Sequence, residues 1–312
     1  MIRSFTMMVL ATATLSHALP AAAEPQVFVY KGAGCDGRDR IPRFEQVMGV
    51  QVVGAVDFLS QDGWPQMIGG AKWALDCWSQ VPIALSISLP MLMKTETSFA
   101  AGLAGANDAA FAQVGSLLVA KGKADASIRV GWEFNGNWYP WAIYRDPAGF
   151  KAYFRRIVGI LRATPGQHFT IVWNPSMNSG SITPENAWPG DDVVDAIGLD
   201  VYNQSWRSQD IDPAVRWQGY LTANYGLNWL ADFAVTHNKP IVIPEWGTGT
   251  RPDGHGWGDD PLFIHNMAAW MRAHNTLFHG YWDFNASDYN AQLSTGLFPN
   301  AAAAYTQEFG PH

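Results

Sequence analysis

The feature that most constrains the fold is a series of eight short apolar runs, rich in β-branched residues, spread over nearly the whole chain. Each run is continuous rather than alternating in polarity, which is typical of strands buried on both faces of a parallel sheet. The runs occupy residues 27–30, 52–58, 82–89, 127–133, 169–173, 194–201, 241–245 and 278–282.

Segments with helical spacing of apolar residues lie between these runs. Residues 148–162 and 261–273 show that spacing, and 109–121 and 215–236 consist mostly of helix-forming residues. Residues 98–108 give a weaker pattern because two glycines interrupt an alanine-rich stretch. Eight strands alternating with helices predict the α/β class and a single (β/α)8 TIM barrel.

A doubly wound open sheet is the competing fold. Gly32, Gly34 and Gly37 match the spacing G-x-G-x-x-G that binds dinucleotides after a first strand. However, the segment 38–42, Arg-Asp-Arg-Ile-Pro, does not read as the helix that should open on a pyrophosphate. The barrel is therefore the favoured prediction, without a cofactor.

The first residues have the pattern of a secretory signal peptide. A basic start precedes an apolar stretch at about residues 7–19, and small residues then lead to Ala23. A membrane anchor is disfavoured because the stretch is short and interrupted by Thr, Ser and His. We expect a signal peptide over 1–23, a catalytic domain over 24–312, and a secreted or periplasmic protein.

The composition points to a neutral ligand. The formal net charge is −7, charged residues make up only 15% of the chain, and tryptophan occurs fifteen times. Nucleic-acid-binding proteins carry a basic patch, which this sequence lacks. We expect a polysaccharide or oligosaccharide as the partner, no nucleic acid, no membrane, and a monomeric protein.

Cys35 and Cys77 are the two cysteines. In an oxidising compartment such a pair is usually bridged, but the predicted barrel gives the two positions no obvious proximity. A disulfide and two buried thiols therefore both stay open. No histidine lies near either cysteine at the spacing of a zinc site.

Two glutamates carry the functional signal, because each ends an apolar run and each lies among tryptophans. Glu133 ends the fourth predicted strand and Glu245 ends the seventh. The carboxyl ends of barrel strands meet at one mouth, so both carboxylates are expected there. A single such glutamate is more often a salt-bridged residue of the rim. Two of them supply the pair of carboxyl groups that glycosidic hydrolysis requires.

Three segments resemble glycoside hydrolase family 26. Residues 132–141 read Trp-Glu-Phe-Asn-Gly-Asn-Trp-Tyr-Pro-Trp, similar to the acid/base motif of that family. Residues 244–247, Pro-Glu-Trp-Gly, are similar to its nucleophile motif. Residues 195–202, Asp-Ala-Ile-Gly-Leu-Asp-Val-Tyr, resemble its signature for the sixth strand, whose tyrosine lies beside the nucleophile.

The resemblance implies a retaining endo-β-glycanase on a (β/α)8 barrel, most commonly a β-mannanase, with lichenase and β-1,3-xylanase relatives. A β-mannan-type backbone is therefore the expected substrate. Mannanases of this family usually carry histidine before the acid/base glutamate, where this chain has Trp132. A lichenase or a bacterial exopolysaccharide depolymerase of the same mechanism is the alternative.

The resemblance also implies roles for individual residues. Glu133 is the expected general acid and base, with a pKa raised by its aromatic neighbours, and Glu245 is the expected nucleophile. Tyr202 is expected to orient that nucleophile. Predicted substrate-binding residues are Trp132, Asn135, Trp138, Trp141, Tyr202, Trp246 and Trp282. A large aromatic side chain is otherwise more often part of a core.

Other classes of function remain as alternatives. An inactive carbohydrate-binding barrel would lack one of the glutamates, and both are present. A metal-dependent hydrolase would need ligands, yet Asp57, Asp200 and Asp283 end strands without a histidine at suitable spacing. We interpret these aspartates as partners of sugar hydroxyls or of Arg129. Lys31 as a Schiff-base lysine is disfavoured because it opens a glycine-rich, exposed turn.

Overall fold

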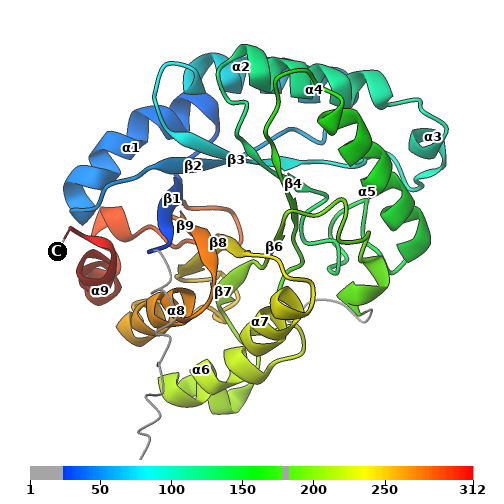
Figure 1. The fold of residues 1–312 in the computed structure, drawn as a ribbon. Coiled ribbons are helices and arrows are strands. Elements are labelled where there is room, and N and C mark those ends of the chain that lie inside the picture. Colours follow the sequence, from blue (N-terminus) through cyan, green and yellow to red (C-terminus); the bar gives the residue numbers. More distant parts are fainter. Residues whose placement is uncertain (1–23, 178–182, 312) are drawn as a thin grey trace, which may run out of the picture.

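The computed structural model describes residues 24–177 and 183–311. The predicted signal peptide, 1–23, lies outside the described residues. Nine parallel strands form one closed sheet, with helices around it (Figure 1). The ring closes because β1 (Gln26–Tyr30) pairs with β9 (Thr276–Trp282) over the whole length of β1. The fold is the predicted (β/α)8 barrel.

The strands keep the order of the sequence around the ring. After β1 come β2 (Gly54–Phe58), β3 (Ala84–Leu89), β4 (Ser127–Val130), β5 (Thr170–Trp173), β6 (Ala196–Gly198), β7 (Val201–Asn203) and β8 (Ile241–Thr248). Both β6 and β7 pair with β8, so they are two segments of one barrel strand. The expected run 194–201 covers β6 and only the first residue of β7.

Helices surround the sheet in alternation with the strands (Figure 1). They are α1 (Gly34–Met48), α2 (Trp64–Trp78), α3 (Ala100–Leu103), α4 (Asp108–Ala120), α5 (Pro147–Arg162), α6 (Pro213–Thr222), α7 (Leu227–Thr236), α8 (Pro261–Ala273) and α9 (Pro299–Phe309). Three of them begin with the same signal, an aspartate cap followed by proline at the first helical position: α5, α6 and α8.

Two expectations about helices were wrong. The segment 38–42 lies inside α1, which continues through Pro42. The single helix expected over 215–236 is divided into α6 and α7, because Tyr225 adopts a left-handed φ of 57°. Gly226 is required at this turn, since a Cβ there would lie 2.4 Å from the carbonyl oxygen of Tyr220.

The core has two layers. A small cluster fills the inside of the barrel and contains Phe28, Val56, Val172, Ala196, Val242 and Phe278. A larger cluster lies between the strands and the helices. The ring of Phe28 stacks on that of Phe278 at 4.3 Å, and Gly54 has no room for a Cβ beside Phe28. This rigid interior holds the carboxyl ends of the strands in place.

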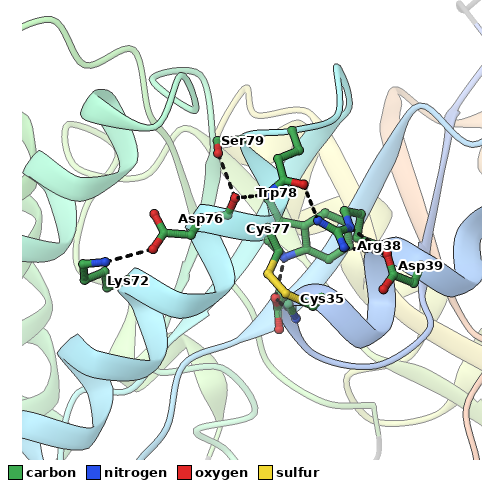
Figure 2. Close-up of a disulfide and its surroundings, with 11 residues drawn as sticks. Cys35, Arg38, Asp39, Lys72, Asp76, Cys77, Trp78 and Ser79 are labelled. Carbon is green, nitrogen blue, oxygen red and sulfur yellow. Dashed lines mark hydrogen bonds and ion pairs between the residues drawn. A yellow bond between two sulfur atoms is a disulfide. The ribbon is translucent and has the colours of Figure 1, made fainter.

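A disulfide joins Cys35 at the start of α1 to Cys77 at the end of α2 (Figure 2). Their Cα atoms lie 5.1 Å apart, and the bond spans 42 residues of chain. A loop of that length corresponds to about 4 kcal/mol in the chain-entropy description of disulfides. The question that the sequence left open is thus answered by the packing of α1 against α2.

A buried carboxylate, that of Asp57, lies beside the disulfide. Asp57 Oδ2 accepts hydrogen bonds from the backbone N–H of Gly34, at 2.8 Å, and from Nε1 of Trp78, at 2.6 Å. These two donors are the neighbours of the bridged cysteines. Burial raises the pKa of Asp57 to about 6. The expectation that Asp57 binds sugar or Arg129 is wrong, because its bonds bind it to the helices behind the barrel wall.

Candidate active site

A cavity of about 1080 Å³ lies at the carboxyl ends of the strands. It is larger than the roughly 300–1,000 Å³ of a typical small-molecule pocket. Both predicted catalytic residues, Glu133 and Glu245, line it. Other residues of the lining include Trp138, Tyr139, Ser176, Asp200, Tyr202, Gln204, Trp206, Arg251, Trp282 and Tyr289.

Glu133 is presented by a turn rather than by the end of a strand. The strand β4 ends at Val130, and Gly131 and Glu133 then take left-handed φ angles of 55° and 52°. A non-glycine residue in that region costs free energy, so the surroundings must hold it. The backbone N–H of Glu133 donates to the carbonyl oxygen of Asn174 at 2.7 Å. The carboxyl group thereby faces the cavity.

The surroundings of Glu133 favour its protonated form. Burial and, second, the negative charge of Glu245 raise the pKa of Glu133 to about 7. Nε1 of Trp138 donates to Oε2 of Glu133 at 2.9 Å and opposes part of that increase. A carboxylic acid that is half protonated near neutral pH can serve as a general acid. The predicted direction of the pKa shift is confirmed.

Glu245 has the opposite surroundings. It lies within β8, where Nη2 of Arg129 donates to its Oε1 at 2.6 Å. The hydroxyl of Tyr202 donates to its Oε2 at 3.1 Å. Each carboxylate oxygen is therefore bound by a donor, one of them cationic, which stabilises the ionised form. An ionised carboxylate is what nucleophilic attack requires.

Arg129 supplies the positive charge on this side of the cavity. It projects from β4, is fully buried, and also donates to Oδ2 of Asp200 at 2.5 Å. The two nearby carboxylates, Asp200 first, raise the pKa of Arg129 against the effect of its burial. Burial raises the pKa of Asp200 and of Tyr202 well above their ordinary values. Tyr202 therefore keeps its hydroxyl proton and donates a hydrogen bond to Glu245, as predicted.

Two predicted sugar platforms border the cavity. Trp138 is 51% exposed and stands beside Glu133, to which it is hydrogen bonded. Trp282, at the end of β9, stacks on Tyr30 with ring centres 4.2 Å apart. The ring of Tyr202 meets Trp282 edge to face at 6.4 Å. Flat, braced aromatic faces of this kind suit the apolar face of a sugar ring.

Two other predicted platforms were wrong, because Trp141 and Trp246 are fully buried. Trp141 lies in a loop, as expected, but that loop folds inward, and its Nε1 donates to the carbonyl oxygen of Trp132 at 2.8 Å. Trp246 points away from the cavity, and its Nε1 donates to Nδ1 of His279 at 3.0 Å. Burial lowers the pKa of His279 to about 3, so that ring is neutral.

Trp132 and Asn135 also lie outside the cavity lining. Trp132 is only 3% exposed, and its Nε1 donates to the hydroxyl of Tyr139 at 2.9 Å. Asn135 exchanges two hydrogen bonds with the backbone of Ser176. Both residues thus fix the loop that presents Glu133, and their predicted direct contact with substrate is corrected to a structural role.

Several cavity residues were missed by the sequence reasoning. Tyr139, Trp206, Arg251 and Tyr289 line the cavity. Trp206 and Arg251 belong to two insertions, residues 205–212 and 248–260, which lie at the ends of β7 and β8. The length of these segments, together with a tryptophan in a loop, would have been sufficient to nominate Trp206.

Lys31 and Asp283 form a buried ion pair beneath the site. Lys31 is 7% exposed, so its predicted exposed turn was wrong. Nζ of Lys31 also donates to Oγ of Ser294 at 3.1 Å. Asp283 is thereby engaged by a lysine and not by Arg129. Across residues 24–177 and 183–311 no group of three or more His, Cys, Asp or Glu side chains is arranged to hold a metal ion.

Residues 124–234 match the family model described as glycosyl hydrolase family 26. Endoglucanase H of Acetivibrio thermocellus is 28% identical over 225 residues, which cover 66% of this chain and 22% of that protein. This chain thus corresponds to about a fifth of the length of that relative.

Solved structures share the barrel. Bacillus subtilis mannanase man26 superposes with a TM-score of 0.64 at 17% identity, covering 93% of this chain and 86% of the other. A double mutant of the Cellulomonas fimi endo-β-1,4-mannanase gives 0.66 at 16% identity, covering 92% and 72%. At such identities the likeness concerns the fold.

The predicted resemblance to glycoside hydrolase family 26 is confirmed over residues 124–234. The matched region contains Glu133, Asp200 and Tyr202 but ends before Glu245. In the described part of the chain, no helix is long and apolar enough to cross a membrane.

Proposed function

We propose that this chain, whose central region matches glycosyl hydrolase family 26, is a retaining endo-β-glycanase. The observation that supports the proposal best is the contrast between the two carboxyl groups of one cavity. Burial holds the pKa of Glu133 near 7, while Arg129 and Tyr202 bind both oxygens of Glu245. An acid and a nucleophile must differ in this way.

The proposed reaction has two displacements. Glu245 attacks the anomeric carbon as the glycosidic carbon–oxygen bond breaks, and Glu133 gives its proton to the departing oxygen. The ionised Glu133 then takes a proton from water, whose oxygen displaces Glu245 from the sugar. Glu133 ends protonated and Glu245 ends ionised, so the enzyme returns to its starting state with one water consumed.

Retention requires the two carboxyl groups to be about 5–5.5 Å apart, against about 6.5–9.5 Å for inversion. The test is proton NMR of the first product. The anomer formed initially should keep the β configuration, and an initial α anomer would replace the proposal with an inverting mechanism.

The proposed substrate is a β-linked polysaccharide with a mannan-type backbone. The names of structurally similar mannanases favour it. Mixed-linkage β-glucan is the second candidate, for two reasons. Trp132 occupies the position where mannanases of the family usually have histidine, and the similar protein from A. thermocellus is named an endoglucanase.

We also propose that the protein is exported and acts as a monomer. The disulfide between Cys35 and Cys77 supports export, because such bonds persist in oxidising compartments. Mass spectrometry of the protein recovered from periplasm and medium should find a mature chain starting at residue 24. Light scattering of that protein should give the mass of one chain.

The decisive experiment is a hydrolysis panel with the mature protein. Glucomannan, galactomannan, barley β-glucan, β-1,3-xylan and bacterial exopolysaccharides are each incubated with the protein, with and without a chelator, and reducing ends are quantified. We expect cleavage of one polymer class, with a rapid fall in viscosity that marks internal cuts. Binding without cleavage would instead favour an inactive carbohydrate-binding barrel. Loss of cleavage with the chelator would favour a metal-dependent hydrolase.

A further inference from the structure

The two insertions beside the cavity are joined into one unit. Gln204 pairs with Gly256 in an antiparallel bridge, and the backbone N–H of Ser205 donates to the carbonyl oxygen of His255 at 3.1 Å. Nη1 of Arg251 donates to the side-chain oxygen of Gln204 at 2.9 Å. The loops that follow β7 and β8 are therefore bonded to each other and form one wall of the cavity.

Trp206 stands on this wall with one side supported. The guanidinium of Arg251 lies over its ring at 5.3 Å, and the ring of His255 lies 5.2 Å away at a tilt of 30°. Trp206 is nevertheless 60% exposed and lines the cavity. An exposed tryptophan forgoes the stabilisation that burial of its ring would give. Here Arg251 and His255 nevertheless hold the ring in one orientation.

The guanidinium that supports Trp206 is itself electrically balanced. Asp253 accepts from Nε of Arg251 at 3.0 Å and forms an ion pair with it. The neighbouring Arg207 is paired with Asp210 in the same manner. The wall thus offers N–H donors and an aromatic face without an excess of either charge. That chemistry fits a neutral, hydroxylated sugar better than an acidic one.

We propose that Trp206, supported by Arg251 and His255, forms a distal sugar subsite that binds a neutral sugar unit away from the cleaved bond. This inference rests on the proposed function. Trp138 and Trp282 border the same cavity from the loop after β4 and the end of β9. A third platform on the β7 and β8 loops extends the binding surface, so that longer chains gain contacts that shorter chains lack.

The test compares chain lengths. Values of kcat/KM are measured for tetra- and hexasaccharides of the manno- and mixed-linkage gluco- series, with wild type and Trp206→Ala. We expect the preference for the hexasaccharide over the tetrasaccharide to fall by about tenfold, mainly through KM, because one stacked unit is lost. Trp206→Phe should restore part of the preference. Arg251→Leu should lower it less, by releasing the ring from its support.

The matched control is Trp73→Ala, which removes another exposed tryptophan, 48% exposed on α2 and absent from the cavity lining. It should leave the preference unchanged. An unaltered preference in Trp206→Ala, with the wild type active, overturns the distal subsite and leaves the proposed function intact.

A second measurement separates the two proposals. Native gels containing glucomannan or barley β-glucan are run with the Glu133→Gln/Glu245→Gln double variant, with and without Trp206→Ala. We expect the polymer to retard the double variant and to retard it less when Trp206 is removed. Equal retardation of both overturns the subsite whatever the activity. If the wild type cleaves no substrate but retardation depends on Trp206, the proposed function fails and the subsite stands.

Discussion

The two sides of the active-site cavity treat the same functional group in opposite ways. On the side of the loop after β4, Glu133 sits on a left-handed backbone and has a pKa of about 7. On the side of β8, Glu245 extends from the strand itself and is bound by Arg129 and Tyr202. Burial without a cation favours the acid, whereas burial with a cation favours the anion.

The proposed catalytic roles therefore follow from the partners of each glutamate and not from the residue type. The two glutamates are chemically identical, and each also influences the other, since the charge of Glu245 helps to keep Glu133 protonated. A substitution on one side of the cavity should therefore change the behaviour of the glutamate on the other side.

The largest effect is expected from removing the nucleophile. Glu245→Ala should lower kcat by about 10⁴-fold or more, because loss of a covalent nucleophile abolishes the first displacement. Initial rates on the polymer identified by the panel measure this. Residual activity within a hundredfold of wild type would contradict the assignment of Glu245. Circular dichroism would show whether the variant is folded.

The next largest effect is expected from neutralising the acid. Glu133→Gln should lower kcat/KM by about 10²–10⁴-fold, the usual contribution of general acid–base catalysis. The wild-type profile should fall above pH about 7, where Glu133 loses its proton, and the variant should lack that limb. A limb that persists in the variant would assign the ionisation to another group.

Arg129→Met tests the cation. It leaves Asp200 and Glu245 buried without their shared partner, so the free energy of unfolding should fall by about 3–5 kcal/mol. The value of kcat should also fall, because Oε1 of Glu245 loses the donor that holds it. Denaturant unfolding and initial rates measure the two effects.

The matched control for this variant is Arg216→Met. Arg216 is 3% exposed and forms a buried ion pair with Asp260, away from the cavity lining. It should cost comparable stability without lowering kcat. If both variants lower kcat alike, then Arg129 acts through general stability and not through its contact with Glu245.

At neutral pH, replacing Glu133 by glutamine should stabilise the protein, whereas replacing Glu245 by glutamine should not. Since the pKa of Glu133 is raised in the folded protein, the folded state retains a proton that the unfolded chain has lost between about pH 4.5 and 7. Stability therefore falls as pH rises through that window. Glu133→Gln should be more stable than wild type at pH 8, by on the order of 1–3 kcal/mol, with no difference at pH 4.

Glu245→Gln is the counterpart of that measurement. It removes a carboxylate that is paired with Arg129, so it should not stabilise the protein at any pH. Thermal melts of the two variants from pH 4 to 8 compare them directly. Equal stabilisation by both substitutions would mean that the two sides of the cavity do not differ in charge preference.

The sequence predicted the parts of this site that follow from regular structure. Continuous apolar runs placed Glu133 and Glu245 at one mouth, because the carboxyl ends of parallel strands must meet there. It could not predict which tryptophans face the cavity. Trp141 and Trp246 have polar or turn-forming neighbours, as Trp138 does, but exposure depends on how each loop folds back onto the barrel.

The charged partners were predicted only in part. The sequence offered Asp200 as a partner of Arg129, which is confirmed. That Arg129 also binds Glu245 depends on strand register across the barrel. The contact between the two insertions that supports Trp206 is likewise a matter of tertiary structure. The local sequence pattern predicts the element on which a residue lies. The packing of distant segments decides what its side chain contacts.

The smallest effect is expected from the hydrogen bond between Trp138 and Glu133. Trp138→Phe keeps an aromatic face beside Glu133 but deletes the Nε1–H that donates to its Oε2. This hydrogen bond stabilises the ionised carboxylate and lowers the pKa of Glu133, so its loss should raise that pKa further. The basic limb of kcat/KM should therefore move to higher pH, as measured in the pH–rate profile of the free enzyme.

Trp282→Phe is the companion variant, because Trp282 lines the same cavity and its ring is braced by Tyr30. It should weaken substrate binding without moving the basic limb. A limb that stays in place in Trp138→Phe would show that Trp138 serves only as a sugar platform. A limb that moves upward would show that a single neutral donor tunes the pKa of Glu133.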